Sequence, residues 1–148
     1  MKLIVKENRE KELTVTVEYP EQNNQVLRII NKMKSEGKFL IGNESGRSYK
    51  VLIPEIYYIE SIDKRTFVYT KDAVFRTDKR LYQLEKELKE YSFVKVSRNC
   101  LLNAGELTHL EALTNSRLEA NLTNGEKIII SRTYIPEIKK VVFRGDLI

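Results

Sequence analysis

The feature that most restricts the fold of this chain is a series of short strand patterns that follow one another closely after Gly46. These segments are rich in β-branched and aromatic residues, and short polar turns separate most of them. They lie at 49–53, 57–61, 66–70, 74–77, 93–96, 100–102, 106–113, 117–122 and 127–131. The sequence therefore predicts a mainly β fold with a few helices.

Local signals add one hairpin and two helices to this region. Asn124 and Gly125 form a pair that favours a type I′ turn, so residues 117–131 are predicted to be a hairpin. Apolar residues at three- and four-residue spacing predict a helix over 79–91. A last short helix is expected over 133–142, with a proline in its first turn.

The first 47 residues predict a different, α+β element. Residues Leu13 to Tyr19 alternate between apolar and polar side chains, which indicates a half-buried strand. Residues 22–35 carry the spacing of an amphipathic helix, and 39–41 reads as a second short strand. We expect this strand–helix–strand element (1–47) to precede a second domain (48–148) and to pack on it, mediate dimerisation or receive a signal.

Charge is distributed unevenly along the chain. The formal net charge is +5, yet residues 61–102 carry ten basic and six acidic side chains, and 127–148 carry five and two. The intervening residues 103–126 carry one basic and four acidic side chains. Two basic stretches around an acidic one suit a protein with one basic face, which favours nucleic acid as a partner.

The residues of a catalytic centre are missing. The chain has one histidine, His109, and one cysteine, Cys100, and no glycine-rich phosphate loop. A single cysteine also excludes an internal disulfide, which fits a reducing compartment. No apolar run has the length of a signal peptide or a spanning helix. We therefore expect a cytoplasmic protein that is not an enzyme and uses no metal, cofactor or small-molecule substrate.

Four segments, in order and at matching spacing, carry a resemblance to a known family. They are Ile56–Ser61 with Phe67–Thr70, Leu81–Leu88, Phe93–Asn103 and Gly125–Arg132. With them, the chain from Ile53 onward resembles the LytTR DNA-binding domain of bacterial transcriptional regulators, in a short form without a receiver domain. The resemblance implies an elongated, mostly β domain that lies along DNA and places loops in successive major grooves.

The resemblance also implies which loops reach the bases. Carried over to this sequence, the base-contacting positions fall at Lys64, Arg65 and Thr66, at Arg98, and at Arg132. The family often has His or Asn in the first loop and a different motif around the second, so the preferred DNA sequence stays open. Arginine forks match guanine in the major groove, and Asn99 suits adenine. Further polar residues beside these loops are predicted phosphate contacts: Lys95, Ser97, Ser131, Thr133 and Tyr134.

Partners follow from this interpretation. We expect double-stranded DNA, a homodimer at least on DNA and, by kinship with similar short regulators, control by a membrane protein. Two alternatives remain at this point. One is a protein-interaction module that uses exposed strands and the helix at 24–34; the other is an RNA-binding protein, although no base-stacking platform of aromatic residues is evident.

Overall fold

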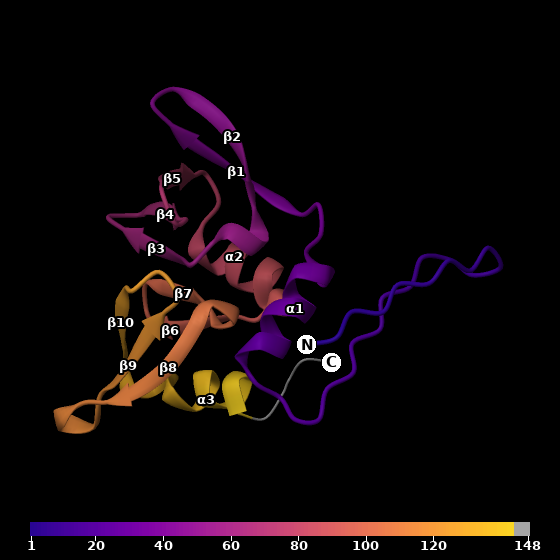
Figure 1. Ribbon diagram of the computed structural model, residues 1–148. Coiled ribbons are helices and arrows are strands. Elements are labelled where there is room, and N and C mark those ends of the chain that lie inside the picture. Colours follow the sequence, from indigo (N-terminus) through magenta and orange to yellow (C-terminus); the bar gives the residue numbers. More distant parts are fainter. Residues whose placement is uncertain (144–148) are drawn as a thin grey trace.

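The computed structural model describes residues 1–143, which form two antiparallel sheets and three α-helices (Figure 1). The helices are α1 (Asn24–Lys34), α2 (Leu81–Leu88) and α3 (Ile135–Phe143). The strands are β1 (Phe39–Glu44), β2 (Arg47–Leu52), β3 (Tyr58–Ile62), β4 (Arg65–Tyr69), β5 (Val74–Thr77), β6 (Phe93–Ser97), β7 (Cys100–Asn103), β8 (Leu107–Ala112), β9 (Leu118–Leu122) and β10 (Lys127–Ile130). Every strand predicted after Gly46 is present, so the mainly β prediction is confirmed.

The order of the strands sets the shape of the molecule. The larger sheet has the order β2-β1-β5-β4-β3-β7-β6, and the smaller has the order β10-β9-β8. Figure 1 shows β1–β5 at one end and β8–β10 at the other, with β6 and β7 between them. Because hairpins join most neighbouring strands of the larger sheet, its turns lie at the two ends of the strands.

Strands β6 and β7 divide two hydrophobic cores. Leu101 packs with α2 and the strands of the larger sheet, whereas Leu102 packs with α1, α3 and the smaller sheet. The same alternation separates Phe93 from Val94 one strand away. Successive side chains of a strand point to opposite faces, so these two strands supply both cores and fix the sheets relative to each other.

Helix α1 packs in the core that contains Leu102, α3 and the smaller sheet. Leu27 is fully buried there, and the N-cap residue Asn23 accepts a hydrogen bond at 3.0 Å from the backbone N–H of Val26. Gly37 follows the helix with a φ of +74°, a left-handed conformation that glycine adopts readily and that commonly ends a helix. The hairpin β1–β2 crosses the expected division at Ser48, and that division stays a prediction.

The prediction of a strand at Leu13 to Tyr19 is wrong, because the structure forms no strand there. The segment is extended and nearly all of it is exposed; Leu13 is 97% exposed and Val15 60%. An alternating pattern becomes a strand only when another strand pairs with it, and no described strand of this chain lies beside the segment. The N-terminal element therefore consists of an extended arm, α1 and β1.

The hairpin β9–β10 is confirmed, but its turn type is not. Among the described residues of this turn, only Gly125 has a positive φ, at +87°. The N–H of Gly125 donates to the carbonyl of Leu122 at 3.0 Å. A type I′ turn needs positive φ at both central residues, so the loop is instead a type I turn followed by a left-handed glycine.

No helix among the described residues is long and apolar enough to span a membrane.

Candidate nucleic-acid interface

Two of the three predicted recognition loops lie side by side, at the same end of the strands of the larger sheet. Ile62 pairs with Arg65, which leaves Asp63 and Lys64 as a two-residue turn with φ of 50° and 65°. In the next hairpin Ser97 pairs with Cys100, which leaves Arg98 and Asn99 as the turn. The backbone N–H of Ser61 donates to the carbonyl of Asn99 at 2.8 Å, which ties the two turns together.

The third predicted loop continues this row beyond the edge of the larger sheet. The N–H of Ser131 donates to the carbonyl of Val96 at 2.9 Å, so the chain leaving β10 runs beside the end of β6. A short 3-10 helix, Arg132–Tyr134, then leads into α3. The structure thus places the β3–β4 turn, the β6–β7 turn and the segment 131–134 in sequence along one side; we call these the recognition row.

Most of the predicted contact residues are accessible in this row. Ser97, Lys95 and Tyr134 are half-buried, and seven are exposed: Lys64, Arg65, Arg98, Asn99, Ser131, Arg132 and Thr133. Each arginine lies in or next to a hydrogen-bonded strand, so its backbone is held by the sheet while its side chain is exposed. A rigid edge of this kind can present guanidinium groups to a flat or grooved partner.

Thr66 is the exception among the predicted base contacts, because its side chain is buried in the larger sheet. Its exposed fraction is 3%. It lies on β4 opposite Ser61 of β3 and Thr77 of β5, in the interior of the sheet. A side chain enclosed by both neighbouring strands does not reach a base edge, so the first loop offers Lys64 and Arg65 only.

Sequence reasoning missed two basic residues beside the first turn. Arg80 donates from Nη1 to the carbonyl oxygen of Lys64 at 2.9 Å. Arg76 and Arg80 line a small cavity of about 140 Å³ together with Lys64 and Arg65. The signal was present in the two adjacent strand patterns: β5 pairs antiparallel with β4, which carries its C-terminal end back to the turn. The first turn therefore belongs to a cluster of four basic residues.

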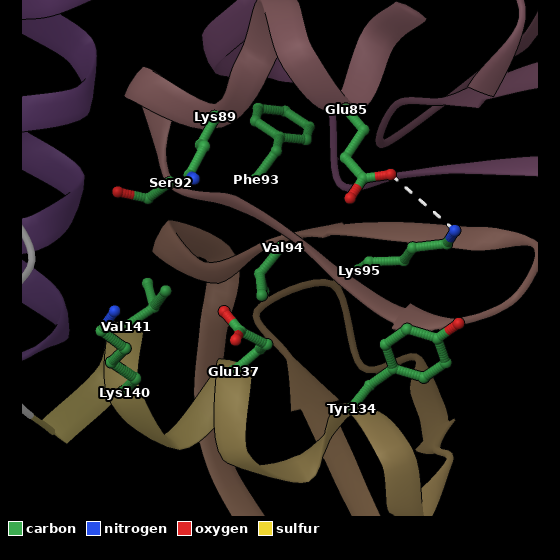
Figure 2. A pocket seen from close by; sticks show the side chains of 10 residues that line it. All are labelled: Glu85, Lys89, Ser92, Phe93, Val94, Lys95, Tyr134, Glu137, Lys140 and Val141. Atoms are coloured by element: carbon green, nitrogen blue, oxygen red, sulfur yellow. Dashed lines mark ion pairs between the residues drawn. The ribbon is translucent and has the colours of Figure 1, made fainter. Parts of the chain in front are cut away.

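Lys95 and Tyr134, two predicted phosphate contacts, are brought together between α2 and α3. Figure 2 shows Lys95 reaching past the ring of Tyr134 toward Glu85. Its Nζ lies 3.8 Å from a Glu85 carboxylate oxygen and 5.8 Å from the centre of the Tyr134 ring. Lys95 and Glu85 are both only half-buried, so the ion pair between them contributes little free energy. Lys95 can therefore leave Glu85 and bind a phosphate instead.

Arg132 joins the row to the loop between β8 and β9. Its Nη2 donates to the carbonyl oxygen of Asn115 at 2.8 Å. Asn115 and Ser116 both have positive φ, at 67° and 59°, so this loop has a sharp, defined conformation. The hydrogen bond orients the guanidinium of Arg132 before any partner arrives, and the rest of its fork stays exposed.

Cys100 and His109 do not form a reactive pair. Cys100 is buried on β7, and burial raises the pKa of its thiol to about 12. The thiolate, which is the nucleophile, is therefore scarce at neutral pH. His109 lies exposed on β8 of the other sheet, and its ring nitrogen Nδ1 is 3.1 Å from the hydroxyl of its neighbour Thr108.

Comparisons with known proteins agree with this arrangement. The family model of the LytTr DNA-binding domain matches residues 46–142. The chain is 33% identical over 92 residues to the sensory transduction protein LytT of Bacillus cereus, which covers 62% of this chain and 37% of that protein. It thus spans little more than a third of the length of that relative.

Two further matches cover more of their partners. An uncharacterized HTH-type transcriptional regulator of Staphylococcus aureus is 25% identical over 134 residues, 89% of this chain and 90% of that protein. A solved structure, the LytTr DNA-binding domain of a Bacillus cereus protein described as a methyl-accepting/DNA response regulator, superposes with a TM-score of 0.65. It is 21% identical and covers 70% of this chain and 94% of that one, so it shows the shared fold. The chain belongs to the LytTr DNA-binding domain family.

Proposed function

We propose that this protein binds double-stranded DNA in a sequence-specific manner and regulates transcription. The observation that carries the proposal is the recognition row, in which exposed arginines sit on sheet-anchored turns along one side of the molecule. Membership of a DNA-binding family supports the same conclusion. In this reading Arg65, Arg98 and Arg132 enter successive major grooves and read base edges.

Phosphate contacts position the row. Lys64, Arg76 and Arg80 surround the first turn, and Lys95 with Tyr134 stands between the second turn and α3. Ser97, Ser131 and Thr133 add hydroxyl groups beside the same turns. Contacts of this type fix the register of a protein on the duplex, while the arginine forks supply sequence discrimination. Asn99, exposed next to Arg98, is a second candidate for base reading.

Selection of bound duplexes from a random DNA pool tests the proposal directly. We expect two short half-sites whose centres are separated by about 10–10.5 base pairs or a multiple of that distance, which keeps two copies on one side of the helix. The recognition row of one protomer contacts too few base pairs to specify one site in a genome, so we expect two protomers to bind together. No enrichment would reject sequence-specific binding, and preferential competition by single-stranded RNA would favour an RNA partner instead.

Substitution of the turn arginines separates base reading from simple attraction to DNA. Arg98→Ala and Arg132→Ala are each expected to weaken the selected site by about 1–3 kcal/mol and to relax preference at one position. Binding to random duplex should change much less. Quantitative gel-shift or fluorescence anisotropy titrations against both DNAs measure this difference.

The matched control for these variants is Lys139→Ala. Lys139 is an exposed basic residue of α3 that lies outside the recognition row, so its loss should leave both affinities nearly unchanged. Equal losses on selected and random DNA would identify the arginines as phosphate contacts. A clear drop in the melting temperature of an arginine variant would show a structural role, which for Arg132 would point to its bond with Asn115.

A further inference from the structure

The N-terminal arm, residues 1–21, is the part of the chain whose sequence pattern the structure leaves unused. Figure 1 shows the tip of the arm reaching away from both sheets and from all three helices, while the two halves of the arm run alongside each other. The root of the arm is anchored, because the side-chain amide of Gln22 donates to the carbonyl oxygens of Val141 and Val142 at 3.3 and 3.5 Å. The arm therefore leaves the body at a fixed place beside the end of α3.

The arm exposes a row of apolar side chains that a strand would normally bury. Leu3 is 83% exposed, Val5 82%, Leu13 97% and Val15 60%. The polar residues Thr14, Thr16 and Glu18 alternate with the apolar ones in its second half. In the first half of the arm Leu3 and Val5 share one face, while Ile4, 65% exposed, lies on the other. An extended segment that exposes this much apolar surface without a strand partner is a ready template for strand pairing, and a surface of this kind indicates a partner.

The turn at the tip of the arm prevents it from pairing well with itself. The N–H of Lys11 donates to the carbonyl of Asn8 at 3.3 Å, so Arg9 and Glu10 are the central residues of a tight turn. A hairpin with this turn would place Leu3 opposite Thr16, and Val5 opposite Thr14. Directly opposite residues share a face, so this register sets Leu3 and Val5 against the polar face of the other half and leaves Ile4 opposite Val15 as an apolar pair.

A second copy is free of that constraint. We propose that the N-terminal arms of two protomers pair antiparallel about a two-fold axis, with residues 2–6 of one copy against 14–18 of the other. In the register that is one residue away from the hairpin, Leu3 lies opposite Val17 and Val5 opposite Val15. The same register places Lys2 opposite Glu18. Two apolar pairs then form on one face, and on the other face Lys2 meets Glu18 while Ile4 lies opposite Thr16.

The size and charge of the arm fit this occupant. Residues 1–19 approach the roughly 20 residues a side that a standard protein–protein interface uses. They contain four basic and four acidic side chains, so the arm carries no net charge. The register brings like charges together only at its centre, Glu10 with Glu10 and Arg9 with Lys11, which lies outside the paired segments 2–6 and 14–18. Because each half of one arm is complementary to the other half, a two-fold axis makes both pairings at once, as an isologous interface requires.

The inference deepens the proposed pairing of two copies on DNA, and it is tested first without DNA. Light scattering and sedimentation of the full chain over micromolar concentrations should show a reversible dimer. Val15→Lys places a charge on the apolar face and should raise the dimer dissociation constant by about tenfold or more. Thr16→Lys, the matched control on the polar face, should remain a dimer. Both variants should melt with the parent, because the arm lies outside the two cores.

A charge exchange tests the register itself. Lys2→Glu should weaken the dimer a few-fold by opposing Glu18, and adding Glu18→Lys to the same chain should restore it. A monomeric parent protein, or a Val15→Lys variant that dimerises like the parent, would overturn the proposal. Equal loss in Val15→Lys and Thr16→Lys would overturn the assignment of faces, and an unrestored double variant would overturn the register.

Binding to DNA distinguishes failure of this inference from failure of the proposed function. Val15→Lys should bind a duplex with one half-site as the parent does and bind paired half-sites less tightly. If the parent protein did not bind a duplex with one half-site, the DNA-binding proposal would be rejected. The dimer measurements without DNA would still decide the role of the arm.

Discussion

Raising the salt concentration from about 50 to 200 mM is expected to weaken binding to duplex DNA by roughly three decades. The basic residues of the recognition row are the reason. Lys64, Arg65, Arg76 and Arg80 gather at the first turn, and Lys95 adds a cation near the second. Cations on this surface would neutralise about six phosphates per protomer, and each neutralised phosphate releases condensed counterions to the solution.

Affinities measured by fluorescence anisotropy at several salt concentrations give the slope of the logarithm of the binding constant. Lys95→Ala should reduce that slope by about one and should weaken selected and random DNA alike, as expected for a phosphate contact. Lys139→Ala, outside the row, should leave the slope unchanged. A flat salt response, or no binding at low salt, would contradict the assignment of this surface to DNA.

Leu27→Ala is expected to lower the free energy of unfolding by about 2–5 kcal/mol. Leu27 is fully buried, and it packs from α1 into the core formed by β6, β7, α3 and the smaller sheet. Truncation removes apolar contacts and leaves a cavity that a core of short strands cannot easily close. Urea denaturation followed by circular dichroism measures the change.

Met33→Ala is the matched control, because Met33 belongs to the same helix and is 47% exposed. It should cost far less. The comparison also tests the expected division of the chain at Ser48. If Leu27→Ala were as mild as Met33→Ala, or if it melted α1 without weakening the sheets, the first 47 residues would be a separate unit. One cooperative, strongly shifted transition would show that α1 completes the core.

Local signals were sufficient for the helices and strands of this protein from Asn24 onward. Strand patterns after Gly46, the spacing of α1 and α2, and the glycines that end α1 and turn β9 into β10 are all readable from neighbouring residues. Such signals work because alternation and three- to four-residue spacing are direct consequences of strand and helix geometry. They failed at Leu13 to Tyr19, where the pattern requires a partner strand and residues 1–143 provide none.

The candidate site was predictable only in part. The sequence pointed to Lys64, Arg65, Arg98 and Arg132 as loop residues, and the structure places all four exposed along one side. Thr66 was assigned to the same loop, but β4 lies between two other strands and encloses it. Arg76 and Arg80 were missed because their position at the first turn depends on how β5 pairs with β4.

The sequence by itself determined the mainly β class, the number of strands after Gly46 and the residues at their turns, because these depend on contacts between near neighbours in the chain. Only the tertiary structure decided the strand order β2-β1-β5-β4-β3-β7-β6, and with it the alignment of three distant turns along one side. Strand order depends on hydrogen bonds between segments far apart in sequence, and local residue patterns do not specify which strands make those bonds.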